Sequence, residues 1–167
     1  PLDRIEKLGG FADYSIRAST VAFLARPGAA QNLDAARLIL DGMARESDED
    51  GRRTRVEAAR LIAWLPDVFE AQLRTLLRDA DPEVARHAIM AVGALKKRTL
   101  VPDVLERLGD PLVVPDALDA LAQFGDTIAG TLFEYLNDAS VSRAIRREIP
   151  ELLLRIGTPV AHRGLLE

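Results

Sequence analysis

The chain has 167 residues, a formal net charge of −4 and no cysteine. That length fits one domain with a sizeable core, and the lack of cysteine excludes disulfide bonds and thiolate metal sites. The acidic balance argues against constitutive binding of nucleic acid. Aromatic residues make up only 5% of the chain, whereas Leu, Ala and Arg are abundant. This composition favours packed helices over a β-sandwich.

The first 47 residues are predicted to be helical but irregular. Helices are expected near residues 2–8, 14–25 and 33–44, with a Pro-Gly turn between the last two. The longest uncharged run near the N-terminus, 18–25, has eight residues, far short of the roughly 20 that span a membrane. The charged residues 48–53 are expected to form a loop.

An internal repeat runs through the rest of the chain. Segment 85–95, ARHAIMAVGAL, aligns with 55–65 at a shift of 30 residues, and its apolar pattern recurs 29 and then a further 32 residues later. Apolar residues within each copy follow three- and four-residue spacing, which indicates helices. Shorter amphipathic segments at 69–79, 100–110 and 127–138 lie between the copies. Each unit is therefore predicted to be a helix pair that buries its apolar face only by stacking on its neighbours.

Proline and glycine mark the ends of these helices. Asp81 and Pro82 are expected to be the N-cap and first residue of one helix, and Gly157 to end another. Pro150 lies inside the last predicted helix, 141–156. An interior proline costs about 3 kcal/mol, so this helix is expected to bend by more than about 20° or to break near residues 146–150.

The segment LLRDADPEVARHAIMAVGAL, 76–95, resembles a HEAT repeat of the bacterial, phycobilisome-lyase-like kind. The likeness rests on a leucine-rich first helix, an Asp in the turn, Pro-x-Val and an Ala-rich second helix, and it extends over about 55–167. It implies an all-α fold, a right-handed α-α superhelix (a HEAT/armadillo-like solenoid) of about four repeats. Residues 1–47 would form an irregular helical cap, 48–53 the charged loop and 54–167 the repeats of a single domain, 1–167.

The resemblance also implies an arginine at the start of each second helix that pairs with turn aspartates. Arg55 and Arg146 stand at that position, whereas Ala85 and Val114 replace it in the other two repeats. The arginine ladder is therefore expected to be interrupted.

Four further segments resemble the HEAT part of large bacterial proteins in which an ATP/ADP-translocase-like membrane region adjoins HEAT repeats. They are 19–28, 35–43, 53–66 and 144–159. This likeness implies a piece of a longer protein, monomeric when isolated. It would be cytoplasmic, would not insert into the membrane, and would be tethered at its inner face through the rest of the parent protein.

No motif in the sequence predicts a catalytic, cofactor-binding or metal site. The two histidines, His87 and His162, are 75 residues apart, and neither is followed by a His, Asp or Glu three or four residues later that would form a metal-binding face. No nucleophile elbow and no phosphate-binding loop is present. Three basic clusters, at 52–55, 96–98 and 143–147, lack interleaved aromatic residues and are interpreted as solvated helix ends.

In HEAT stacks the second helix of each pair lines the concave face, and removing the buried positions leaves an outward stripe on those helices. The stripe consists of Glu57, Arg60, Trp64, His87, Met90, Ala94, Asp116, Asp119, Gln123, Glu148, Glu151 and Arg155. It becomes acidic toward the C-terminus, which repels phosphate. The residues expected to bind a partner are Trp64, Met90, Asp116, Asp119, Glu148 and Glu151. For Trp64, however, its place before Leu-Pro favours packing on the next repeat over a role as an exposed anchor.

The predicted function is a non-catalytic protein-interaction or regulatory scaffold module. Its acidic face would bind a basic or amphipathic protein segment, or a neighbouring domain of the same chain, with no cofactor and no nucleic acid. One alternative is a HEAT-like nucleic-acid or DNA-lesion binder, although such proteins use a basic concave face. Another is a HEAT-like chromophore lyase.

Circular dichroism should show a predominantly helical protein without sheet, because every periodic segment follows the helical spacing. A strand content like that of an average globular domain, about 20–25%, would contradict the repeat interpretation.

Overall fold

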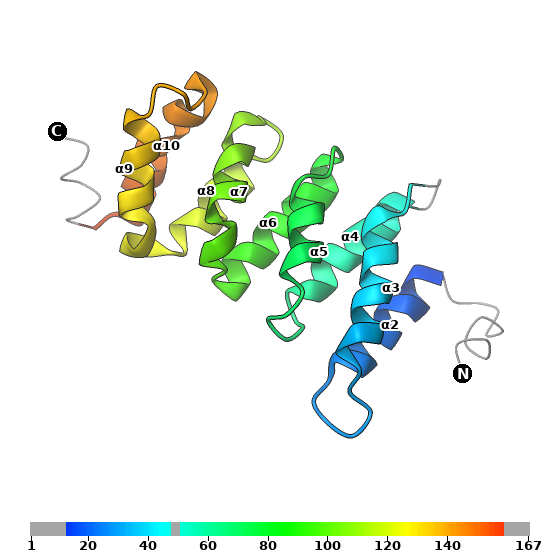
Figure 1. The fold of residues 1–167 in the computed structure, drawn as a ribbon. Helices are drawn as coiled ribbons and strands as arrows, with labels where there is room; N and C mark the ends of the chain where they lie inside the picture. Colours follow the sequence, from blue (N-terminus) through cyan, green and yellow to red (C-terminus); the bar gives the residue numbers. More distant parts are fainter. Residues whose placement is uncertain (1–12, 48–50, 159–167) are drawn as a thin grey trace. The chain divides into compact units, whose positions relative to one another are not determined.

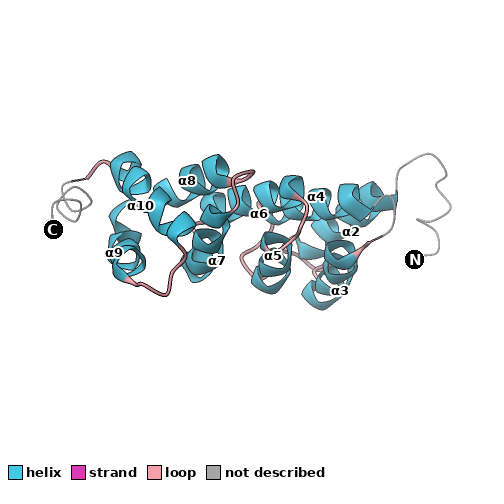
Figure 2. Ribbon diagram, turned by 90° about the horizontal axis from the view of Figure 1, so that it is seen from above, coloured by secondary structure: helices cyan, strands magenta, loops and turns pink. Residues whose placement is uncertain are grey.

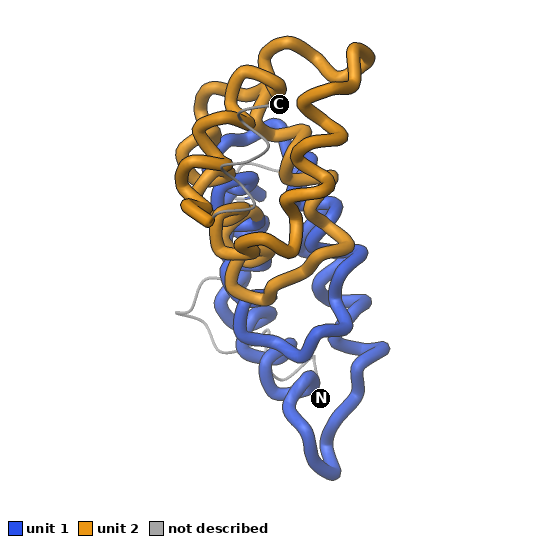
Figure 3. Tube along the Cα trace, turned by 90° about the vertical axis from the view of Figure 1, so that its left-hand side faces the viewer, with its two compact units in different colours: residues 1–88 blue, residues 89–167 orange. Residues whose placement is uncertain are grey.

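The computed structural model describes residues 13–47 and 51–158, and these residues contain nine α-helices, three short 3₁₀ helices and no strand (Figure 1). The all-α repeat fold predicted from the sequence is confirmed. The chain divides into two compact units, residues 1–88 and 89–167 (Figure 3). The boundary between them falls within helix α6, Pro82–Leu95.

The first unit contains four complete helices and the first turns of α6. They are α2 (Asp13–Ala25), α3 (Leu33–Arg45), α4 (Gly51–Ile62) and α5 (Glu70–Leu77). Helices α2 and α4 lie in one layer and α3 and α5 in the other, with α2 packed against α3 and α4 (Figure 2). The largest side chains buried between the layers are aliphatic or aromatic: Leu40, Met43, Ile62, Phe69, Leu73, Leu76 and Leu77.

The second unit has the same two-layer organisation. After the rest of α6 it contains α7 (Val101–Glu106), α8 (Val114–Ala122), α9 (Ala129–Asn137) and α10 (Arg143–Ile156). Short 3₁₀ helices flank α7 at Arg98–Leu100 and Arg107–Gly109, and a third, Gly125–Ile128, precedes α9. Helix α8 packs against α7 and α10, and α9 packs against α10 (Figure 2).

The burial of equivalent residues confirms the repeat register. Ala58, Ala88, Ala117 and Ile149 occupy the same position in the four second helices, and each has 0% exposure. The alanines at this position in the first three of these helices let neighbouring helices approach closely, as expected for a fold with few aromatic residues.

The predicted helix caps are also confirmed. The carboxylate of Asp81 accepts a hydrogen bond of 2.9 Å from the amide of Glu83, next to Pro82 at the start of α6. Gly157 has a left-handed φ of +67°, and its amide donates to the carbonyl of Leu153 at 3.2 Å. Such a conformation is accessible to glycine without a Cβ penalty.

Two boundary predictions fail or lie outside the described residues. The expected loop 48–53 is wrong for 51–53, because α4 already begins at Gly51. A Cβ atom at Gly51 would lie 2.6 Å from the carbonyl oxygen of Glu46, so glycine allows the chain to fold back and start the helix early. The helix expected near 2–8 falls in a segment that is not described.

The sequence predicts a bend or a break at Pro150, and of these two outcomes the break is wrong. Helix α10 runs uninterrupted from Arg143 to Ile156 with Pro150 inside it. Its inner side buries Ile145, Ile149, Leu152 and Leu153. Burying an aliphatic side chain of this size contributes about 1.5–3 kcal/mol, so packing offsets the local cost of the proline.

Glu46, just after α3, joins three helices of the first unit. Its carboxylate accepts hydrogen bonds from Arg17 of α2, at 2.5 and 3.0 Å, and from Thr54 of α4 at 3.3 Å. Its backbone carbonyl accepts one from Arg55, which also pairs with Asp79 at 2.6 Å. The Arg55–Asp79 pair is the arginine–turn aspartate contact that the family resemblance implied.

The pKa of Glu46 lies below its ordinary value of 4.5, chiefly because Arg17 hydrogen-bonds to the carboxylate; burial opposes this effect only in part. A carboxyl whose pKa is lowered by folding stabilises the fold above its unfolded pKa. That contribution disappears as the pH falls through the folded pKa.

We therefore expect Glu46→Gln to lower the free energy of unfolding by about 1–2 kcal/mol at pH 7, because Arg17 loses a charged partner. The difference from the parent chain should be smaller at low pH than at pH 7, because Glu46 becomes protonated as the pH falls through its lowered folded pKa. Urea unfolding at several pH values measures both quantities. Asp34→Asn is the control, since the Asp34 side chain is 94% exposed and exposed pairs contribute only about 0–1 kcal/mol. An equal loss for Glu46→Gln at both pH values would contradict the role of its charge.

Gly93 of α6 marks a close approach between helices in the second unit. A Cβ atom there would lie 3.1 Å from both Cα and Cβ of Ala120 in α8 and 3.0 Å from the side-chain nitrogen Nε2 of Gln123. These contacts are tighter than ordinary van der Waals packing, so the spacing of α6 and α8 depends on a residue without a side chain.

Gly93→Val should therefore destabilise the protein by about 1–3 kcal/mol through overpacking. The same change at Gly42, in α3, should leave stability within about 0.5 kcal/mol, since no atom lies within 4 Å of a Cβ at that position. Thermal unfolding of the two variants separates a packing effect from a change in helix propensity. Equal stability of the two variants would contradict close packing at Gly93.

Candidate functional site

All twelve residues of the predicted outward stripe are exposed or half-buried, which confirms the exposure inferred from the repeat register. The stripe is divided between the two units. Its first four members, through His87, belong to the first unit, and the remaining eight, from Met90 onward, belong to the second.

Within the second unit the stripe is continuous from α6 to α10. The Gly93–Ala120 contact places the end of α6 directly beside α8. Arg155 of α10 forms an ion pair with Asp119 of α8 and another, at 2.8 Å, with Glu151. The hydrogen bond to Glu151 is the main cause that raises the pKa of Arg155 above its ordinary value.

These pairs change the charge balance of the predicted acidic surface. Glu148 also has an arginine partner, Arg147, at 3.0 Å. The mutual repulsion expected among the four carboxylates is therefore reduced by arginines on α10. We call Met90, Asp116, Asp119, Glu148 and Glu151 the acidic face, because it still holds four carboxylates and an exposed apolar side chain.

The two large apolar residues of the stripe are both exposed. Met90 is 52% exposed in the second unit, and Trp64 is 88% exposed in the first. The favoured interpretation of Trp64, packing on the next repeat, is therefore wrong. Leu65 and Phe69 are buried instead, at 8% and 1% exposure, so the turn after α4 directs these neighbours inward and leaves the indole in solvent.

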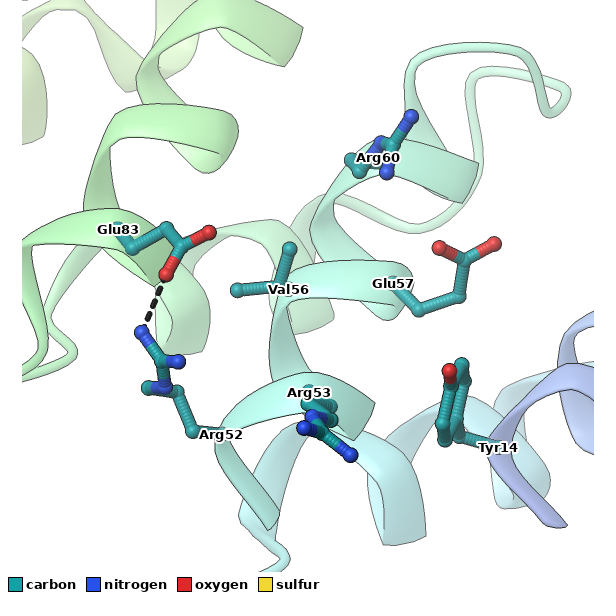
Figure 4. Close-up of a pocket in the computed structure, with 7 residues that line it drawn as sticks. All are labelled: Tyr14, Arg52, Arg53, Val56, Glu57, Arg60 and Glu83. Atoms are coloured by element: carbon teal, nitrogen blue, oxygen red, sulfur yellow. Dashed lines mark hydrogen bonds and ion pairs between the residues drawn. The ribbon is translucent and has the colours of Figure 1, made fainter. Parts of the chain in front are cut away.

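The first unit contains a hollow that sequence reasoning missed, with a volume of about 240 Å³ (Figure 4). Its lining comes from α2, α4 and the first turn of α6: Tyr14, Arg52, Arg53, Val56, Glu57, Arg60 and Glu83. The signal in the sequence was the arginine spacing on α4, but Tyr14 lies outside the repeat register and gave no sign of its position.

The basic clusters are predicted to be solvated helix ends, but several of their side chains also make contacts with other parts of the protein. Arg52 pairs with Glu83, Lys96 donates to the carbonyl of Gln123, and Arg98 donates to that of Thr127 at 2.8 Å. Lys96 also lies 5.8 Å from the ring centroid of Phe124. These contacts link residues 27 to 31 positions apart in sequence, close to the repeat period, so several basic side chains tie one repeat to the next.

The described residues contain no group of three His, Asp or Glu side chains that could hold a metal ion. His87 is half-buried and has an interaction partner, whereas His162 lies outside the described part. None of the described helices is both long and apolar enough to cross a membrane.

A model of HEAT repeats matches residues 70–129. This segment of the chain therefore consists of HEAT repeats. The matched segment begins at α5, runs through α6, α7 and α8 and ends at the start of α9. HEAT repeats generally mediate protein–protein interaction, and their fold is typically a non-catalytic scaffold. A search of curated proteins gave no match.

Proposed function

We propose that the chain is a protein-interaction module whose acidic face binds a basic or amphipathic segment of a partner protein or of a neighbouring domain. The observation that carries this proposal is the exposure of Met90 among four carboxylates on adjoining helices of one unit. A HEAT-repeat scaffold supports the same conclusion.

The two kinds of residue contribute differently to binding. Exposed ion pairs contribute only about 0–1 kcal/mol each, so the carboxylates mainly attract and orient a basic segment. Their influence reaches about 8 Å at physiological salt. Affinity would come mainly from an apolar contact, and Met90 is suited to this because a flexible thioether adapts to different partners.

We also propose that the chain is a regulatory or scaffolding part of a larger bacterial protein. Support comes from the resemblance of segments such as 144–159 to the HEAT part of translocase-like membrane proteins. In that setting the module is cytoplasmic and held at the inner face of the membrane by the rest of the protein. A full-length sequence without an adjoining membrane region would contradict this proposal.

The acidic face can be tested with a helical lysine–leucine peptide as the probe. Asp116→Lys combined with Asp119→Lys should weaken its binding about tenfold or more at physiological salt, because two attractive charges become repulsive. Isothermal titration calorimetry measures the affinity. Circular dichroism should show an unchanged fold, since Asp116 is half-buried and Asp119 is exposed.

A matched control carries the same charge change elsewhere. Asp13→Lys with Asp34→Lys alters two carboxylates of the first unit with 71% and 94% exposed side chains, and it should weaken binding by less than about threefold. Equal weakening in both double variants would show that the effect comes from the net charge of the protein and not from the acidic face. Unchanged binding after reversal of Asp116 and Asp119 would place the interaction surface elsewhere.

A further inference from the structure

The hollow of the first unit has an electrostatic character opposite to that of the acidic face. Three of its seven lining residues are arginines, and all three come from α4. Arg53 and Arg60 are seven residues apart, two turns of the helix, and therefore lie on the same side of α4. Figure 4 shows the three guanidinium groups arranged around Val56, with Tyr14 on the side of α2 and Glu83 on the side of α6.

The arginines differ in the partners they already have. Arg52 forms an ion pair with Glu83, which neutralises both groups. Arg60 is exposed and makes no hydrogen bond or ion pair with any residue that the structure describes. Its planar guanidinium has five N–H donors and can bind a carboxylate in a bidentate manner, through two parallel hydrogen bonds. Arg60 is therefore the cation of the hollow that is available to a ligand.

Apolar surface adjoins this cation. Val56 is half-buried at the centre of the hollow, and the ring of Tyr14 lies at its edge (Figure 4). Trp64 follows Arg60 by four residues, and its amide donates to the carbonyl of Leu61 at 3.0 Å. Helix α4 itself ends at Ile62, so the 88% exposed indole belongs to the turn that follows the helix.

The volume of the hollow and the other charges that line it limit the class of ligand that it can bind. A volume of about 240 Å³ is below the roughly 300–1,000 Å³ of small-molecule sites and suits one or two amino-acid side chains. Glu57 also lines the hollow, and its carboxylate would repel a phosphate dianion or a polyanion more strongly than a single carboxylate. An acidic side chain with an aliphatic stem fits both the charges and Val56.

We propose that this hollow is a carboxylate-binding site for an acidic segment of a partner protein. The carboxylate pairs with Arg60, the side-chain stem packs on Val56, and flanking apolar atoms of the segment cover Trp64. This site is separate from the acidic face and takes a segment of the opposite charge.

The sole tryptophan of the chain, Trp64, follows Arg60 by four residues and serves as the optical probe of the site. The probe is a short blocked peptide with a single glutamate beside one leucine, titrated at physiological salt while Trp64 fluorescence is recorded. Binding should shift the emission of the solvent-exposed indole to shorter wavelength. Arg60→Glu should weaken binding about tenfold or more, and Arg60→Lys should restore part of it, because lysine keeps the charge but lacks the planar fork.

The matched control is Arg143→Glu in the second unit, an exposed arginine with the same change in charge. It should leave the affinity for the acidic probe within about twofold. Because Arg60 is exposed, Arg60→Glu should keep its helical circular dichroism. Arg60→Gln, which adds no negative charge, gives the same comparison should the first variant be unfolded. Binding of the lysine–leucine probe should be unaffected by Arg60→Glu and by Arg143→Glu. A negative result for the hollow is therefore distinguishable from a negative result for the acidic face.

Three results would overturn the proposal. The first is an absence of binding of the acidic probe to the parent chain. The second is equal weakening by Arg60→Glu and Arg143→Glu, which indicates only a net-charge effect. The third is equal or tighter Arg60-dependent binding of inorganic phosphate or single-stranded DNA, which would make the hollow a phosphate site instead.

Discussion

The helices in the described part of this protein are at most marginally stable by themselves, and the rest of the structure follows from that constraint. The described α-helices have 6 to 14 residues, whereas an isolated helix shorter than about 12–15 residues is marginal in water. One helix pair also cannot enclose its own apolar face. Stacking is therefore obligatory, and the small residues at Ala58, Ala88, Ala117 and Gly93 allow it by bringing backbones together.

Polar contacts reinforce this stacking at intervals that match the repeat. Arg17 reaches Glu46, Arg52 reaches Glu83 and Arg98 reaches Thr127, at sequence separations of 29, 31 and 29 residues. The Arg17–Glu46 pair and the Arg55–Asp79 pair are the least exposed of the ion pairs. We expect them to contribute most to stability, since burial strengthens an ion pair that is fully hydrogen-bonded. The exposed ones contribute little energy, but they decide which charges remain on the surface.

The two units thus present different chemistry to a partner. In the second unit Arg155 moderates an acidic surface without removing its excess of carboxylates. In the first unit Arg52 is occupied by Glu83, whereas Arg60 is exposed and is followed four residues later by an exposed tryptophan. A module with the proposed acidic and basic sites would discriminate among partner segments by charge, and Met90 and Trp64 would supply the apolar contacts.

Helix positions, repeat register and the exposure of the outward stripe followed from the sequence alone. The reason is that a helix with one buried side records that burial in the three- and four-residue spacing of its apolar residues. The caps at Asp81 and Gly157 are equally local, because side-chain and backbone chemistry within a few residues determines them.

Only the tertiary structure decided which exposed residues meet. Nothing in the sequence indicated that Arg60, Glu83 and Tyr14 line one hollow, or that Arg155 joins Asp119 to Glu151. Sequence reasoning also misjudged the packing of Trp64, the break at Pro150 and the start of α4 at Gly51. Each of these depends on distances that only the folded chain sets: a turn buries Leu65 and Phe69 in place of the indole, packing holds α10 together across a proline, and the carbonyl of Glu46 passes too close to Gly51 for any side chain. Local periodicity carries no information about such distances, because they are set by how closely neighbouring helices pack.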